Sequence, residues 1–512
     1  MTNDHHRGDL GALLTSTIDA RARADAALRP SDELLAGMHR SVRRRRTVRH
    51  ATTAAFSLLA ATAVGAAAWT GLQGDRDVAP AGPTPVVKSL EYVQAGPGLP
   101  TALAGGDAKT LLAKAKDDAV VIVVQPNAED LAGSLGRGVH GAAYLVEGDG
   151  TRHHLTDLAA TPSMTLERWD RGSTTALVTY RADDGLWVAN LDLTTGTTRD
   201  EVGPLGDAEV EFLGESPDGA DLMVTSQGDA FGLGVADLDA DEPVWAGIVE
   251  VPSATAALNP SGTLVVTGAA ASAPGGSFAI VDLDAQDGAA LIDFTATDPR
   301  TEAGYEGVYR DTCIIAGWVD DEHFLLNCAD MAETGARGDE DDTEVGRSEF
   351  LVDVSPEALA KAPVVTAEMT DNQTRPVAGS AVSLGGGAVA YARQSEAYDY
   401  CSDGVLGWRP DPTTGVGTGW VVQDGDVTGK RDVISRLQVA GGRIVVEASA
   451  GGCEGTSSPM HVRSVPIDAP DLKDDGAVVL LPPYTDTQTW PDAPRAMAES
   501  VHVTTVVASQ TR

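Results

Sequence analysis

The sequence predicts an all-β protein: a β-propeller of about seven blades, preceded by a short helical N-terminal segment and one transmembrane helix. Three observations lead to this fold class. A repeat of roughly 45 residues, with turn signals between apolar runs, recurs in the central part of the chain. A long uncharged stretch follows a run of arginines near the N-terminus. Glycine is frequent, with 56 residues, whereas aromatic residues make up 5%, as in a turn-rich β protein. The repeat length also permits six or eight blades.

Residues 1–50 form the first predicted region, a cytoplasmic head that is helical and basic. Apolar residues from Leu10 to Ala22 recur at helical spacing, and Asp9 is placed to cap the first turn. A second helix is predicted to open at Ser31 and to run toward the uncharged stretch.

Residues 51–72 form the predicted transmembrane helix, because no Asp, Glu, Lys or Arg occurs between His50 and Gly74. At about 1.5 Å per residue, such a helix crosses a hydrocarbon core of about 30 Å. Five arginines precede the span and define its orientation: Arg43, Arg44, Arg45, Arg46 and Arg49. Since positive flanks stay in the cytoplasm, the N-terminus is predicted inside and the C-terminal bulk outside the cell membrane. A cleaved or twin-arginine export signal and a buried Ala-rich helix of a soluble protein are the alternatives.

Residues 73–107 are predicted to be a stalk between the membrane and the propeller. Five prolines and several glycines lie between Asp75 and Pro100. This composition is typical of an extended linker.

The predicted propeller, residues 108–508, is defined by a repeated pattern of turn and strand. Ser-Pro-Asp-Gly at 216–219 leads into the apolar run 222–224, and Asn-Pro-Ser-Gly at 259–262 leads into 264–266. Each tetrapeptide suits a tight turn, and each following run suits a strand buried on both faces. A later strand of each repeat ends with an acidic residue that enters a turn: Asp192, Asp239 and Asp284. Because one four-stranded unit cannot bury its faces alone, the copies are expected to pack around an axis.

These residues resemble WD40-like propellers of the TolB-like periplasmic type, in which a Ser-Pro-Asp-Gly turn and a Leu-x-Val-x-Asp-Leu strand recur in each blade. The resemblance is clearest over 165–285, and it implies a propeller fold. Insertions at Ala329–Arg347 and Ala397–Thr418 interrupt the period. The strand Val501–Val507 is predicted to pair with Val120–Val124 and so to close the ring. The predicted blades are 108–160, 164–202, 208–252, 254–298, 309–369, 375–428 and 431–508.

The chain has four cysteines, all beyond the predicted span: Cys313, Cys328, Cys401 and Cys453. An even number outside the membrane fits disulfides in an oxidising compartment. If Asp320-Asp321 is a two-residue hairpin turn, Cys313 faces Cys328 within bridging distance. That pairing leaves Cys401 with Cys453, although four cysteines permit three pairings.

Charge and motifs restrict the chemistry. The net charge is −38; residues 1–50 carry +4, and the remainder therefore carries −42, which disfavours nucleic acid as a partner. No nucleophile elbow, His-Glu-x-x-His motif or Walker loop is present. Asp237, Asp239 and Asp241 begin like a calcium loop, but Glu242 and Ile248 occupy the positions of its essential Gly and Glu. No catalytic, cofactor-binding or metal-binding residue is therefore assigned, and no cofactor is expected.

The predicted function is that of a membrane-anchored extracytoplasmic propeller that binds or senses a protein, glycan or envelope ligand. An extracytoplasmic hydrolase or lyase with carboxylates near the propeller axis is one alternative. Residues 1–50 also weakly resemble the cytoplasmic heads of actinobacterial anti-sigma proteins. That resemblance implies a second alternative, a transmembrane regulator with a sigma factor as its partner.

Overall fold

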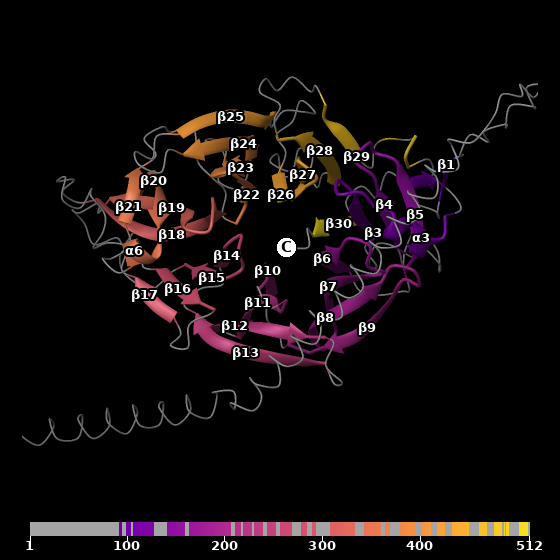
Figure 1. Ribbon diagram of the computed structural model, residues 1–512, viewed down its shortest axis with the longest axis horizontal. Coiled ribbons are helices and arrows are strands. Elements are labelled where there is room, and N and C mark those ends of the chain that lie inside the picture. The colour runs from indigo at the N-terminus through magenta and orange to yellow at the C-terminus, as the bar shows by residue number, and fades with distance from the viewer. Residues whose placement is uncertain are drawn as a thin grey trace, which may run out of the picture. The chain divides into compact units, whose positions relative to one another are not determined.

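In the part of the chain that the structure describes, six β-sheets surround a common axis, so the fold is a β-propeller (Figure 1). Five of the sheets have four strands, and the sixth has ten. Apart from 246–248, the described residues belong to one compact unit, 77–245 and 249–512. The computed structural model describes residues 92–94, 99–103, 106–126, 141–158, 163–205, 210–216, 219–227, 230–238, 243–251, 256–268, 278–283, 289–292, 308–332, 343–359, 364–368, 379–394, 402–410, 417–424, 433–449, 460–467, 476–483, 486, 488–490 and 501–509.

Each four-stranded sheet is built from strands that are consecutive in the chain. The first strand of each sheet lies nearest the axis, and the last lies at the outer rim (Figure 1). The first two sheets contain β10 (Val210–Glu215), β11 (Asp221–Gln227), β12 (Ala230–Asp237) and β13 (Val244–Val251), then β14 (Ala256–Leu258), β15 (Leu264–Thr267), β16 (Phe278–Asp282) and β17 (Ala289–Ile292). The next contains β18 (Val308–Trp318), β19 (His323–Ala332), β20 (Thr343–Asp353) and β21 (Val364–Glu368). The last two contain β22 (Val382–Gly385), β23 (Ala388–Gln394), β24 (Ser402–Pro410) and β25 (Gly417–Asp424), then β26 (Val433–Ala440), β27 (Arg443–Ser449), β28 (Met460–Pro466) and β29 (Val478–Leu481).

The ten-stranded sheet joins the two ends of the propeller domain. Its order is β1-β2-β5-β4-β3-β30-β6-β7-β8-β9. The C-terminal strand β30 pairs antiparallel with β3 over its length, from Val120 opposite Val507 to Pro126 opposite Val501. It pairs in parallel with β6 only at Ala508 and Ser509. The strands are β1 (Tyr92–Gln94), β2 (Thr101–Leu103), β3 (Val120–Pro126), β4 (Ala142–Val146), β5 (Arg152–Asp157), β6 (Met164–Asp170), β7 (Thr175–Ala182), β8 (Gly185–Asp192), β9 (Thr197–Val202) and β30 (Val501–Ser509).

Strand β3 illustrates why these sequences form buried strands. Its valines alternate between two core clusters, since Val121 and Val123 enter one cluster and Val120 and Val124 enter the other. Successive side chains of a strand point to opposite faces, so a continuous apolar run is stable only where both faces are covered. Strands β6, β7 and β8 of the same sheet cover one face, and β27, β28 and β29 of the neighbouring sheet cover the other. The valines are fully buried.

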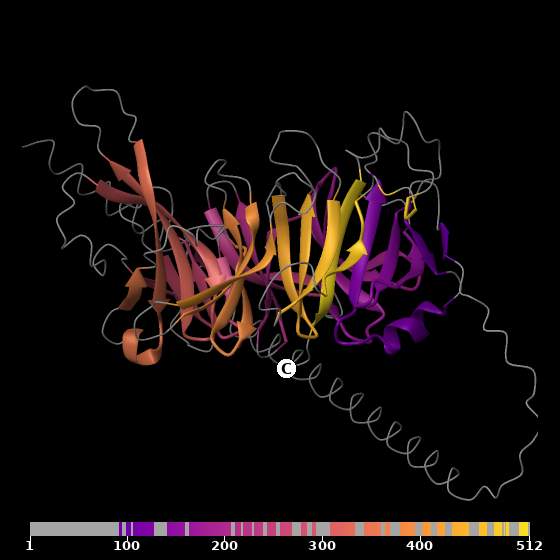
Figure 2. The same cartoon turned by 90° about the horizontal axis from the view of Figure 1, so that it is seen from above.

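Two short helices lie at the same face of the sheets (Figure 2). They are α3 (Ala108–Ala113) and α6 (Pro356–Leu359). The Asp107 carboxylate caps α3 by accepting a hydrogen bond from the backbone N–H of Thr110, 3.0 Å away. Leu112 of α3 is fully buried, so this helix covers the core beside the ten-stranded sheet.

The predicted turns are confirmed. The Gly219 N–H donates to the carbonyl of Ser216 at 2.9 Å, and the Gly262 N–H donates to the carbonyl of Asn259 at 2.9 Å. Both glycines have positive φ, +86° and +76°, a conformation that favours glycine. The side chain of Asp192 also enters a turn, as predicted, by accepting from the N–H of Thr194 at 2.8 Å.

The predicted ring closure is confirmed as well, since Val501–Val507 pairs with β3. The predicted stalk, 73–107, is too long, because β1 and β2 lie within it, and Leu103 of β2 pairs with His153 of β5. The predicted insertion Ala397–Thr418 is also wrong in part, since it contains β24. The ends of the other insertion are strands too, with Ala329 opposite Arg347. Apolar periodicity is weak in these stretches, and their pairing is set by tertiary neighbours.

The predicted cytoplasmic head, 1–50, and the predicted span, 51–72, lie outside the described residues. Among the residues that are described, no helix is long and apolar enough to cross a membrane.

Candidate functional site at the ring closure

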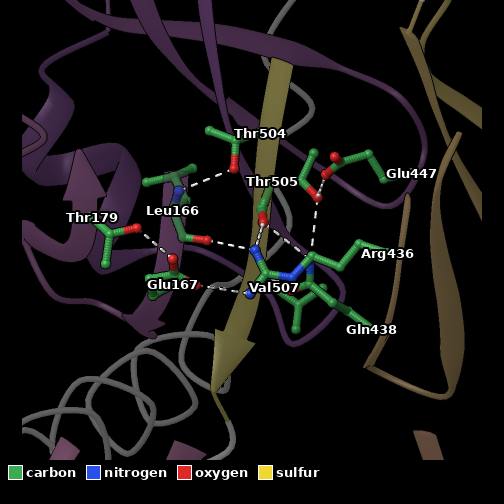
Figure 3. A network of polar contacts seen from close by, with 9 residues as sticks. All are labelled: Leu166, Glu167, Thr179, Arg436, Gln438, Glu447, Thr504, Thr505 and Val507. Carbon is green, nitrogen blue, oxygen red and sulfur yellow. Dashed lines mark hydrogen bonds and ion pairs between the residues drawn. The ribbon is translucent and has the colours of Figure 1, made fainter. Parts of the chain in front are cut away.

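A cluster of polar side chains lies beside β30, which is close to the axis (Figure 1). We call it the closure seam. Its side chains come from β6, β26, β27 and β30, and Figure 3 shows them converging on β30. The residues of the closure seam are Glu167, Arg436, Gln438, Glu447 and Thr505.

Side chains replace a backbone ladder on one edge of β30. Strand β3 pairs with the other edge. On the seam side, Gln438 donates from Nε2 to the carbonyl of Thr505 at 3.0 Å and accepts from the N–H of Val507 at 2.9 Å. Buried backbone groups that lack hydrogen-bond partners destabilise a fold. The amide of Gln438 supplies the donor and the acceptor that a neighbouring strand would otherwise offer to β30.

Arg436 joins three elements through one guanidinium group. Its Nη1 donates to the carbonyl of Leu166 on β6 at 2.6 Å and to the carbonyl of Thr505 on β30 at 3.3 Å. Its Nη2 lies 3.5 Å from the Glu167 carboxylate. The Arg436 side chain is 27% exposed and that of Glu167 is 9% exposed, so the ion pair is largely shielded from water.

Glu447 holds the seam from the side of β27. Its Oε2 accepts from the hydroxyl of Thr505 at 2.9 Å, and its Oε1 accepts from the hydroxyl of Ser435 at 3.1 Å. On β6, Glu167 accepts from the hydroxyl of Thr179 at 2.7 Å. The two carboxylates thus have protein donors, as buried charges require.

Burial raises the pKa of Glu167, while Arg436 and the Thr179 hydroxyl act in the opposite direction. Burial likewise raises the pKa of Glu447 against the influence of Arg436 and the hydroxyl of Thr505. Desolvation disfavours the ionised form of a carboxyl group. The positive charge of Arg436 therefore offsets only part of the desolvation cost of ionising Glu167 and Glu447.

A third carboxylate, Glu211 on β10, adds to this imbalance. Its pKa is raised to about 7, first by burial and then by the negative charge of Glu167. The Glu211 side chain is exposed to solvent. Solvent therefore screens part of the repulsion between Glu211 and Glu167, but the direction of the shift follows from two like charges near one another.

A separate charge cluster links β6 to the neighbouring sheet. Arg168 lies 2.7 Å from Asp221 of β11 and 3.2 Å from Glu215 of β10. The side chain of Asp221 is 3% exposed. Arg168 therefore has a structural role, because its ion pairs link β6 to β10 and β11 of the neighbouring sheet.

No group of three or more His, Cys, Asp or Glu side chains in the described part of the chain is arranged to hold a metal ion. The closure seam instead offers two carboxyl groups, Glu167 and Glu447, whose pKa values burial raises.

The predicted disulfide residues are only partly within the described chain. Cys313 of β18 lies opposite Cys328 of β19 in the register. The predicted two-residue turn at Asp320-Asp321 is wrong, because Trp318 pairs with Phe324 and the turn is one residue longer. A bulge between Ile315 and Gly317 restores the register that places the two cysteines opposite each other.

The remaining predicted site positions lie outside the described residues: Cys401, Cys453, Arg43, Arg44, Arg45, Arg46 and Arg49.

Sequence reasoning missed the closure seam because its members are far apart in the chain. Arg436 and Leu166 are 270 positions apart, and Glu447 and Thr505 are 58 apart. The available signal was a charged residue inside an otherwise apolar strand, such as Glu447 after Val445 and Val446. Such a residue is seldom buried unless it has a partner.

No protein-family model and no curated protein matched the sequence. Among solved structures, the β-propeller domain of the trilobed protease from Pyrococcus furiosus is similar over 74% of this chain and 95% of that chain, with 12% identity and a TM-score of 0.40. TolB from Acinetobacter baumannii is similar over 67% of this chain and 81% of that chain, with 10% identity and a TM-score of 0.28. The tricorn protease is similar over 72% of this chain but only 36% of that chain, with 12% identity and a TM-score of 0.36. These similarities concern the fold alone.

Proposed function

We propose that this protein is a membrane-anchored extracytoplasmic propeller that binds a protein, glycan or envelope ligand through one face. The observation that carries the proposal is a difference between the two ends of the sheets. At one end the chain turns back tightly, since β22 ends at Gly385 where β23 begins at Ala388, and β26 ends at Ala440 where β27 begins at Arg443. The longest connections between described strands lie at the opposite end, among them Ile292 to Val308 and Leu481 to Val501, whereas the longest at the first end, Pro466 to Val478, is shorter.

Long connections on a rigid scaffold commonly carry recognition residues. Buried strands and the closure seam make the sheets such a scaffold. The net charge of −42 beyond residue 50 favours a basic partner surface for this face.

We infer further that the propeller has seven blades. The ten-stranded sheet contains two four-stranded arrays, β30-β3-β4-β5 and β6-β7-β8-β9. Only two residue pairs join β30 to β6. Divided at that junction, the sheet contributes two blades in addition to the five separate ones.

The extracytoplasmic location is part of the same proposal. It rests on the arginines that precede the predicted span and on the four cysteines beyond it. We propose the disulfides Cys313–Cys328 and Cys401–Cys453. The register of β18 and β19 supports the first. The second is supported by connectivity, since Cys401 belongs to the connection between β23 and β24, and Cys453 to the equivalent connection in the next sheet along the chain.

Crosslinking in intact cells tests the binding function. A membrane-impermeant crosslinker would be applied to cells that express the tagged full chain. Replacing the connection 293–307 with a Gly-Ser linker should abolish a specific crosslinked product. Replacing 411–416, at the opposite end of the sheets, is the matched control and should leave the product intact. Equal products from both variants would refute the assignment of the binding face.

An extracytoplasmic hydrolase or lyase is the second candidate, and the carboxyls near the axis favour it. Carboxyl groups with raised pKa occur frequently at catalytic sites. Glu167 and Glu447, however, are engaged with Thr179, Arg436 and Thr505, which suits a structural role. Hydrolysis of chromogenic glycosides or esters that is lost in Glu211→Gln, with unchanged folding, would make this candidate the better one.

A further inference from the structure

The N-terminal end of the propeller domain lies across the junction of two strand arrays. We call residues 92–94 and 99–103 the outer strap; they contain β1 and β2, at one edge of the ten-stranded sheet. Leu99 and Ala102 are buried in one core cluster with Ile122 of β3 and Leu480 of β29. The outer strap therefore covers apolar side chains where the array β30-β3-β4-β5 meets the sheet β26-β27-β28-β29.

Arg152 of β5 fastens the outer strap to the neighbouring sheet. Its Nε donates to the carbonyl of Thr101 at 3.1 Å, and its Nη1 donates to the carbonyl of Leu480 at 3.4 Å. The guanidinium also lies over the ring of Tyr92, 5.6 Å from the ring centroid, which is within the range of a cation–π interaction. One side chain thus contacts β1, β2 and β29.

The outer strap also holds the connection from β29 to β30. The Thr101 N–H donates to the carbonyl of Thr489 at 2.8 Å, and Trp490 is buried in the same core cluster as the outer strap. On the side of β4, the hydroxyl of Tyr144 donates to the carbonyl of Pro100 at 3.3 Å. The outer strap therefore joins the closing array, the preceding sheet and the connection between them.

The outer strap is attached less firmly than the strands it covers. Among the described residues, β2 pairs with β5 at one position, Leu103 opposite His153, whereas β3 pairs with β30 at seven positions. The side chains of Tyr92 and Val93 are each 43% exposed. Segments with few backbone pairs and exposed side chains open at a lower free-energy cost than core strands. We therefore expect the outer strap to open before the sheets unfold.

We propose that the outer strap is a releasable clasp. Docked, it fastens the sheet β26-β27-β28-β29 to the closing array; released, it uncovers Tyr144, Leu480 and Trp490. This inference does not depend on the proposed binding function. Under that function, release would also loosen the binding face, because the connection from Leu481 to Val501 belongs to it. A pull on the chain before Tyr92 would reach the outer strap first.

Thiol labelling of a buried strap position tests the clasp in the full chain. Ala102 is 1% exposed, so the thiol in Ala102→Cys should react slowly with a maleimide. Adding Arg152→Met removes the hydrogen bonds to Thr101 and Leu480 and should accelerate labelling by roughly tenfold or more, because hydrogen bonds to a charged group are lost. The label is located in the tryptic peptide 89–109, which has no native cysteine.

Two controls separate release of the outer strap from general loosening. Ala143 of β4 is fully buried in another core cluster, and labelling of Ala143→Cys should stay slow when Arg152→Met is added. Arg199→Met, which removes a largely exposed guanidinium, should leave the labelling of Ala102→Cys unchanged.

Two results would overturn the releasable clasp. One is labelling of Ala102→Cys that Arg152→Met does not accelerate. The other is equal acceleration at Ala102→Cys and Ala143→Cys, which would show that the whole propeller loosens. Should the methionine variant fold poorly, Arg152→Lys keeps the charge but loses the planar fork of donors, and the same pattern with a smaller increase is expected from it.

Discussion

Arg436 serves two elements at once. Its guanidinium pairs with Glu167 and also donates to backbone carbonyls of β6 and β30. Glu167 and Glu447 are both influenced by this one positive charge, and burial raises the pKa of each. The positive charge of Arg436 thus offsets only part of the cost of burying these two carboxylates.

Replacing Arg436 with Met should test this dependence. The change keeps the aliphatic length but leaves Glu167 and Glu447 without their cation. Removing one partner of a buried ion pair costs roughly 3 kcal/mol. Because both carboxyls can then take up protons, the loss should be smaller at about pH 5 than at about pH 8.

Denaturant unfolding at both pH values measures the effect. The control is Arg199→Met, since the Arg199 side chain is 55% exposed and its ion pair with Asp200 spans 3.6 Å. Exposed pairs contribute roughly 0–1 kcal/mol. Equal losses from the two substitutions would show that Arg436 has no special role in the seam.

At the scale of elements, the hairpin of β18 and β19 depends on one glycine. Gly317 forms a bulge with φ of +144°, and a Cβ at this position would collide with the backbone oxygen of Ala381. Gly317→Ala should therefore destabilise the protein by roughly 2 kcal/mol. In Gly232→Ala, the added methyl group would lie 3.7 Å from Oγ1 of Thr225, an ordinary contact, so little change is expected. Thermal unfolding of both variants checks the contrast, and similar midpoints would contradict it.

The same hairpin bears on the proposed disulfides. Trypsin should release residues 311–337 with both Cys313 and Cys328, 394–430 with Cys401, and 444–463 with Cys453. Without reduction, the mass of 311–337 should show an internal bridge, and 394–430 should be linked to 444–463. Peptide 311–337 linked to either of the others would exclude this pairing. Free thiols in all three peptides would argue against the oxidising location itself.

The sequence predicted elements best where local chemistry determines them. The tetrapeptides at 216–219 and 259–262 fix turns through a glycine with positive φ, so the strands that follow them were located correctly. Strands β1 and β2 were missed because only their tertiary pairing, Leu103 with His153, identifies them as strands. The extra residue in the turn after Trp318 was also missed. The bulge between Ile315 and Gly317 shifts the register back by one residue, so Cys313 still lies opposite Cys328.

At the scale of the whole domain, the chain closes its ring with its own end. Contacts between residues hundreds of positions apart, such as Leu166 with Thr504, hold β30 in place. Closure of such long loops is entropically costly and slow. It also removes the open edge that β3 would otherwise expose to aggregation. The pairing of β3 with β30 could be predicted from the sequence because β3 begins as a continuous apolar run and β30 is rich in valine and threonine, which favour strands. The closure seam could not be predicted from the sequence, because no local pattern links its residues.

The most direct test of the closed ring is an engineered crosslink between its two ends. Val121 and Val506 are register partners that enter the same core cluster, and opposed residues of antiparallel strands lie within disulfide range. In Val121→Cys/Val506→Cys, trypsin should release 117–137 linked to 496–512 under oxidising conditions. The control Val121→Cys/Val507→Cys should give no such link, because Val507 packs against the other cluster. Absence of the link in the first variant, or its presence in the control alone, would contradict closure of the propeller by β30.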